Sequence, residues 1–349
     1  DMDNVLLKYS FLFMAHQKPE VMSSYNELIK YNKDKLSDFS YNKDYFDFIS
    51  SLKTEDESDV VWQEKQVKDF IKRGLNLPKK DQDRLIEISK ELSELSINFL
   101  QNINLSRKEW SFELPLELIS TLKEEHQNLF KEGKMSYNMN NVIDIMTTAD
   151  NKEVRRKLSE KNKEVANVGT SHDNSEIIKK IVLLKHENAN ILGKKSVCDL
   201  ILEETMSEDF KSASDFLINF KNSLLPFAIK EDQALGDFVQ EKFGVSEIES
   251  YSAAYYSDKY KEHLFSYKKD EERKYFNIDD ALKATFNLIE NLFNISFEKV
   301  KDGFIFPIEN EDIPTYKIIN NGKVKGQVVL DLYEREGKKT GAWVSNLIA

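Results

Sequence analysis

The stretch KVKGQVVLDLYEREGKKTGAWVSNLIA, residues 323–349, begins with the pattern of a β-strand and ends in a polar segment that carries glycines. Its first part is rich in valine and leucine, and Asp331 and Tyr333 fall on one face at a period of two residues. Asn321-Gly322, just before it, is a strong hairpin signal. The pattern alone favours an ordinary hairpin at the edge of a small sheet, although a loop on a rigid strand is also a common binding surface.

Strand patterns are confined mainly to this part of the chain. Outside two short strand patterns near residues 110–140, they occupy residues 303–308, 315–319 and 323–333, whereas the preceding sequence has helical periodicity. Only 6 prolines and 11 glycines occur among 349 residues, which argues against an all-β chain. The sequence therefore predicts a mainly α fold with a small β region near residues 303–333.

Composition narrows the class of protein. The net charge of −11 makes a nucleic-acid partner unexpected. No apolar run approaches the length of a membrane span, and the N-terminal residues do not resemble a signal peptide. The single cysteine, Cys198, excludes an internal disulfide and suits a reducing compartment, and its apolar helical context predicts burial. We expect a soluble, cytoplasmic protein without a membrane partner.

Helix signals divide the first 300 residues. Gly74 is placed to end one helix and Pro78 to open the next. That second helix carries apolar residues spaced by three and four positions, which predicts an antiparallel partner helix within the chain: Leu85, Ile88, Leu92, Leu95 and Phe99. Further along, Pro226 is expected to separate two helices, the second ending at Gly244.

Several motifs resemble one known family. DLYEREGKKTGAWVSN, residues 331–346, is similar to a segment of the thimet oligopeptidase and oligopeptidase A family of zinc metallopeptidases. Its Gly-Ala-Trp is closer to the oligopeptidase A and peptidyl-dipeptidase branch. Residues 147–167 and 174–193 resemble the family's middle segment, and Tyr255-Tyr256 match a tyrosine pair, although Tyr251 and Ser252 stand where the family usually has Trp-Asp. These motifs keep the family's order over most of residues 45–349.

The resemblance implies an architecture. It is that of the helical half of a neurolysin-like channel fold, covering the N-terminal and middle portion of the family. We expect an N-terminal helical region with short strands at 1–150, a helical middle region at 151–302 and a small β region at 303–349. That last region would lead towards an absent zinc-binding catalytic half.

The family's zinc site requires two histidines four residues apart on one helix, with a glutamate between them as the base. The chain has 5 histidines, none four residues from another. The nearest approach, HENAN at 186–190, has Asn190 in the second ligand position. We therefore expect no catalytic residue and no metal ligand in this chain, with the Zn²⁺ of the parent enzyme held by ligands outside it.

Three residues remain as site candidates: Asp331, Tyr333 and Arg335. On a strand, all three would point to one face. The resemblance implies that they line the wall of the substrate channel without acting in catalysis. A cross-strand charge pair with a packed tyrosine explains the same pattern.

The functional expectation follows from this resemblance. The chain would be the non-catalytic, channel-forming portion of a zinc metallo-oligopeptidase, a hydrolase that acts on short peptides. Its partners would be those peptides and the missing C-terminal catalytic half, and alone it would be inactive. The alternative is a non-catalytic helical scaffold or complementing subunit derived from that family.

Overall fold

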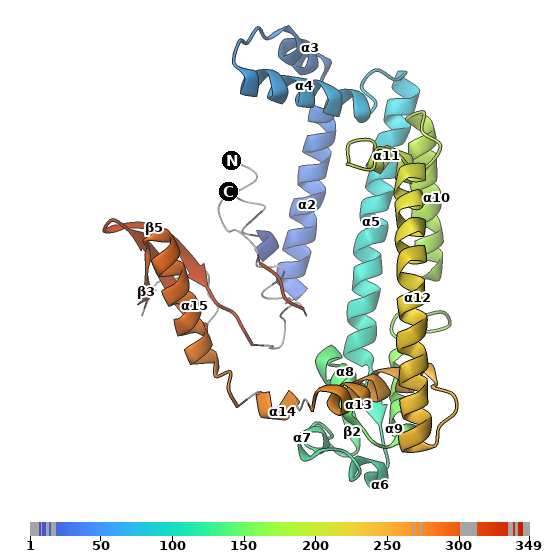
Figure 1. The fold of residues 1–349 in the computed structure, drawn as a ribbon. Helices are drawn as coiled ribbons and strands as arrows, with labels where there is room; N and C mark the ends of the chain where they lie inside the picture. The colour runs from blue at the N-terminus through green and yellow to red at the C-terminus, as the bar shows by residue number, and fades with distance from the viewer. Residues whose placement is uncertain are drawn as a thin grey trace.

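A computed structural model describes residues 7, 9–11, 14, 19–266, 269–272, 274–300, 313–333, 338 and 341–344. These residues form a mainly helical molecule with two small sheets, as predicted (Figure 1). No helix among them combines the length and apolar character needed to cross a membrane. The helices are α2 (Pro19–Ser40), α3 (Lys43–Ser51), α4 (Glu57–Lys72), α5 (Lys79–Glu109), α6 (Leu116–Ile119), α7 (Glu124–Gln127), α8 (Met139–Thr148), α9 (Lys152–Asn162), α10 (Ser175–Ile191), α11 (Val197–Leu202), α12 (Phe210–Phe243), α13 (Ala253–Phe265), α14 (Lys269–Glu272) and α15 (Ile278–Phe293), with a 3-10 turn η1 (Ser250–Ser252).

Both sheets are antiparallel. The first pairs β1 (Ser111–Glu113) with β2 (Lys134–Ser136), with Phe112 opposite Met135. The second has the order β3-β4-β5, formed by Ser296–Val300, Thr315–Asn320 and Lys323–Val329. The predicted hairpin is confirmed, but β3 was not predicted and β5 ends four residues before Tyr333. The strand predicted at 303–308 lies outside the described residues.

The long helix α5 packs on α10. Gly74 ends α4 with a φ of 92°, a conformation that side chains disfavour, and a Cβ there would lie 2.7 Å from Leu85 Cδ1. Near the start of α5, Arg84 forms a two-bond ion pair with Glu187 near the end of α10, with Nε–Oε1 at 2.6 Å. At the other end, Asn102 donates to Asn174 at 2.9 Å. The two helices are therefore antiparallel, which confirms the partner predicted from the α5 spacing.

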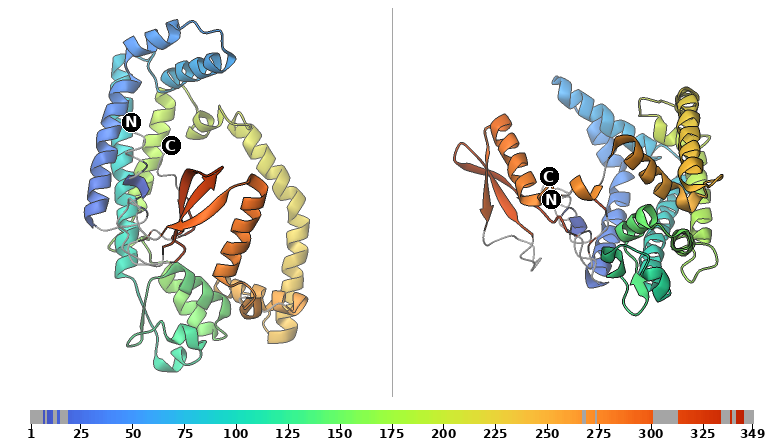
Figure 2. Two further views of the ribbon diagram at one scale, coloured as in Figure 1. Left: turned by 90° about the vertical axis from the view of Figure 1, so that its left-hand side faces the viewer. Right: turned by 60° about the horizontal axis from the view of Figure 1, so that its bottom comes forward.

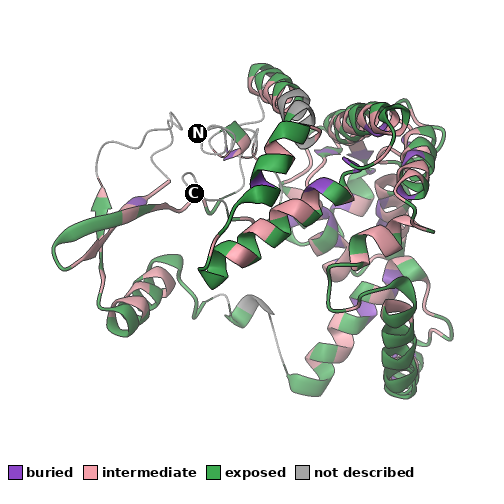
Figure 3. Ribbon diagram, turned by 90° about the horizontal axis from the view of Figure 1, so that it is seen from above, coloured by how far each residue is buried: buried purple, intermediate pink, exposed green. Residues whose placement is uncertain are grey.

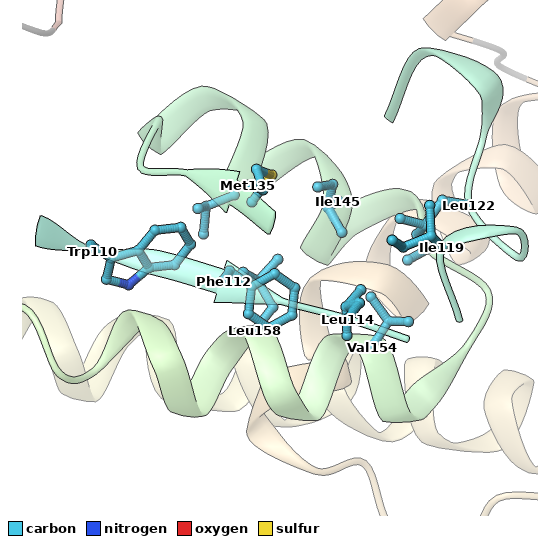
Figure 4. Packing of buried hydrophobic residues seen from close by; sticks show 11 residues of the cluster. Trp110, Phe112, Leu114, Ile119, Leu122, Met135, Ile145, Val154 and Leu158 are labelled. Carbon is cyan, nitrogen blue, oxygen red and sulfur yellow. The ribbon is translucent and has the colours of Figure 1, made fainter. Parts of the chain in front are cut away.

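A hydrophobic cluster below α5 joins the first sheet to helices α6, α8 and α9 (Figure 4). Ile145, Val154 and Leu158 are fully shielded from solvent at its centre. The Trp110 indole N–H donates to the carbonyl of Lys161 at 3.0 Å, so its polar atom is satisfied within the cluster. The cluster takes residues from both sides of position 150.

Arg155 connects this cluster to α13. Its side chain is only 1% exposed, and its guanidinium donates to the carbonyls of Ala149 and Asp150 and, from Nε and Nη2, to Ser252 Oγ at 3.2 and 3.1 Å. The guanidinium carbon also lies 4.1 Å from the centre of the Tyr255 ring. Ser252, at the position where the resembled family usually has aspartate, therefore supplies a neutral acceptor to a buried cation.

Tyr255 completes this junction. Its hydroxyl donates to the Asp150 carboxylate at 2.8 Å. Burial, together with that hydrogen bond and the neighbouring negative charge, raises the pKa of Tyr255 above its ordinary value. The hydroxyl therefore stays protonated and keeps its role as donor at neutral pH.

Two sequence predictions are wrong in this part of the chain. Pro226 lies inside α12 and does not divide it, because a long helix tolerates one missing backbone bond when its other bonds continue. Figure 2 shows α12 changing direction along its length. Cys198 is exposed rather than buried, because it lies with Ile201, three residues on, on the outer face of the short helix α11.

We predict that Ser252→Ala lowers the free energy of unfolding by about 1.5–3 kcal/mol, since it removes the hydroxyl that accepts from a buried guanidinium. Urea denaturation followed by circular dichroism would measure this change. The matched control is Ser257→Ala, an exposed position on α13, the helix that follows Ser252, with an expected change within about 0.5 kcal/mol. Equal stability of both variants would contradict the role assigned to Ser252.

Candidate functional site

The segment after β5 is held by a lysine. The Lys338 ammonium donates to the Asp331 carbonyl at 2.6 Å, to Asp331 Oδ1 at 3.1 Å and to the Tyr333 carbonyl at 2.9 Å. The Lys338 and Asp331 side chains are only 10% and 11% exposed. An ammonium has three donors, so all three are used within this one turn.

The strand β5 ends at Val329, short of the predicted end at Tyr333. Beyond β5, Leu330 N–H still donates to the Pro314 carbonyl at 3.0 Å, and the carbonyls of Asp331 and Tyr333 accept hydrogen bonds from Lys338. Asp331 and Tyr333 therefore do not lie on a common strand face. Tyr333 is 58% exposed, and Arg335 lies outside the described residues.

Lys338 was not identified from the sequence. The available signal was a lysine directly after Gly337, placed seven residues after an aspartate that follows a strand. Such a spacing does not by itself distinguish a lysine that binds carbonyls from one that is solvated. Only the fold of the turn shows that the ammonium is enclosed.

The tryptophan of the Gly-Ala-Trp motif, residues 341–343, contacts the other end of the described chain. The ring of Trp343 meets that of buried Phe11 edge-on, with centroids 6.0 Å apart and planes at 72°. Lys338 thus holds Asp331 and Tyr333, and the aromatic pair holds Trp343. Its described residues present a positioned surface, and neither Asp331 nor Lys338 is arranged to activate a nucleophile.

A second candidate region lies between α2 and α5. A groove there has a volume of about 470 Å³. Its lining combines isoleucines with hydroxyl, amide and charged side chains of both signs: Ser23, Asn26, Glu27, Ile29, Lys30, Ile86, Ser89, Lys90, Ser93, Glu94 and Ile97. Mixed polar and apolar lining suits a ligand with a peptide-like character.

One group of side chains in the described residues has the composition of a metal site. Potential ligand atoms of Glu125, His126 and Asp144 lie within 4.8 Å of one another. His126 Nε2 is 2.9 Å from Asp144 Oδ2, while its Nδ1 is buried without a hydrogen-bond partner. The group offers one imidazole and two carboxylates, whereas the zinc site of the resembled family needs two histidines four residues apart on one helix, so the group does not match that site.

Comparison with known proteins identifies the family. The sequence profile of peptidase family M3 matches residues 145–349, more than half of the chain. The chain therefore belongs to peptidase family M3, which confirms the resemblance described above.

The chain is similar to several curated oligopeptidases. It is 27% identical to oligopeptidase A of Escherichia coli over 297 residues, which cover 81% of this chain and 43% of that protein. The match to oligopeptidase A of Haemophilus influenzae is 29% identical over 300 residues, covering 82% and 44%. Saccharolysin of Saccharomyces cerevisiae is 25% identical over 300 residues, covering 79% and 41%. The chain thus spans less than half the length of these relatives.

We predict that Lys338→Met loosens the turn that follows β5, because it removes the donor shared by two carbonyls and a carboxylate. Hydrogen exchange measured by mass spectrometry should show faster exchange in peptides covering residues 330–344. Lys325→Met, at an exposed position on β5, is the matched control and should leave that exchange unchanged. Unchanged exchange in the Lys338 variant would show that the ammonium does not hold the turn.

A second prediction concerns metal content. Since the Glu125, His126 and Asp144 group contains a single imidazole and not the histidine pair of the family's zinc motif, the chelator-washed chain should not retain stoichiometric zinc. Elemental analysis of the chain, after incubation with zinc and desalting, would test this. One tightly bound zinc ion in each chain would contradict the prediction, and its loss on His126→Ala would locate the site.

Proposed function

We propose that the chain is the channel-forming, non-catalytic portion of a zinc metallo-oligopeptidase that hydrolyses short peptides. One observation carries this proposal: four-fifths of the chain aligns with oligopeptidase A but covers only 43% of the E. coli enzyme. The zinc ligands and the catalytic glutamate would lie in the C-terminal half of the enzyme, outside the aligned region. When bound there, zinc would polarise the scissile carbonyl and activate water.

In this proposal the chain's own residues confine and orient the peptide. The antiparallel pair α5–α10 provides a rigid wall, and the groove between α2 and α5 provides polar contacts for an extended backbone. Asp331, Tyr333 and Arg335 line the channel, with Lys338 holding the described part of that segment in place. A narrow, prepositioned channel favours short, unstructured peptides because they can enter without first unfolding. A folded protein would have to lose its own structure before entering.

The regions 1–150, 151–302 and 303–349 would serve as N-terminal wall, middle wall and link to the catalytic half. The assembled enzyme would act in the cytoplasm.

The alternative is a helical scaffold or complementing subunit without a role in hydrolysis. This alternative is favoured because the sequence has no two histidines four residues apart, the spacing that the zinc motif requires. The two proposals differ in whether activity appears when the zinc-bearing half is supplied.

The expected result is that the chain alone does not hydrolyse a quenched short peptide and that adding the zinc-bearing half restores turnover. The reason is that the metal-activated water and base would come only from that half. The control replaces the zinc-motif glutamate of the added half by alanine and should give no turnover. Chelator-sensitive turnover by the chain alone would overturn the proposal, as would a stable, zinc-loaded two-chain complex that is inactive.

A further inference from the structure

The middle of α12 carries an exposed apolar surface. Every residue from Asp215 to Gln233 is exposed, and Figure 3 shows this helix at one side of the molecule. Eight large apolar side chains in this stretch are each at least 47% exposed: Phe216, Leu217, Ile218, Phe220, Leu224, Leu225, Phe227 and Ile229. We call residues 215–229 the α12 apolar surface.

These residues are arranged in stripes along the helix. Phe216, Phe220 and Phe227 are spaced by four and seven positions, as expected for one face of a helix, and Leu217 and Leu224 flank them. The rings of Phe216 and Phe220 stack, with centroids 6.1 Å apart and planes at 8°. The only charged residues in 215–229 are Asp215, which pairs with Lys211, and Lys221.

The same stripe is an interface further along the helix. Leu235 and Phe238 continue it, and with Val239 they pack on the tyrosines of α13. Phe238 and Val239 are only 9% and 0% exposed there. Figure 2 shows the middle of α12 standing apart from α5 and α10. Within the described residues, α12 thus buries this face where another helix is available and exposes it where none is.

We infer that the α12 apolar surface is the docking site for the zinc-bearing half of the enzyme, through an apolar helical face of that half. This inference rests on the proposed function. A surface with so few charges suits a permanent interface, which resembles a divided protein core, and does not suit a charged ligand. The relatives supply a matching source of partner surface, since more than half of each lies outside the aligned region.

The test compares two double variants with the same added charge. Phe220→Asp with Leu224→Asp disrupts the apolar stripe, whereas Asn219→Asp with Asn222→Asp places two carboxylates on the polar side of the same turns. All four positions are exposed, so both variants should fold as the native chain does, as circular dichroism and thermal melting would show. Binding is measured to the zinc-bearing half with its motif glutamate replaced by alanine, so that affinity is independent of turnover.

We expect the apolar-stripe variant to bind about a hundredfold more weakly than the native chain, and the polar-side variant to bind within about threefold. Equal, tight binding of all three chains would overturn the inference and leave the proposed function standing. No binding by the native chain to a folded, zinc-loaded half would overturn both. A homodimer that the stripe variant abolishes and the zinc-bearing half does not displace would assign the surface to a second copy instead.

Discussion

The buried guanidinium of Arg155 is the interaction on which the arrangement of the helices depends. It stands at the corner between α8 and α9, and it binds two carbonyls of that corner and the hydroxyl of Ser252. Its stacking on Tyr255 extends the junction to α13, and α13 in turn supports the C-terminal end of α12. A buried cation is costly unless all its donors are used, so these elements have few alternative positions.

The same principle acts on a smaller scale after β5. There the Lys338 ammonium uses its three donors on one turn, and two of its acceptors are backbone carbonyls. In both places a cation binds backbone carbonyls and so fixes the path of the chain rather than performing chemistry. A chain path fixed in this way suits the proposed channel-forming role, which itself rests on the alignment with oligopeptidase A.

Local signals predicted much of the fold. The glycine at 74, the proline at 78 and the spacing of apolar residues on α5 depend on backbone conformation and helical geometry, which are properties of nearby residues. The continuity of α12 through Pro226, the exposure of Cys198 and the end of β5 depend on which surfaces meet in three dimensions. For the same reason the sequence indicated Asp331 and Tyr333 as candidates but not Lys338, which holds them.

Photo-crosslinking of a short peptide to the assembled, zinc-loaded enzyme tests the central claim most directly. The enzyme would carry alanine at its catalytic glutamate, and the peptide would carry a photoreactive side chain at successive positions. If this chain forms the channel wall, crosslinked residues should occur in 331–343 and in the groove between α2 and α5. Crosslinks confined to the zinc-bearing half at every peptide position would contradict the account.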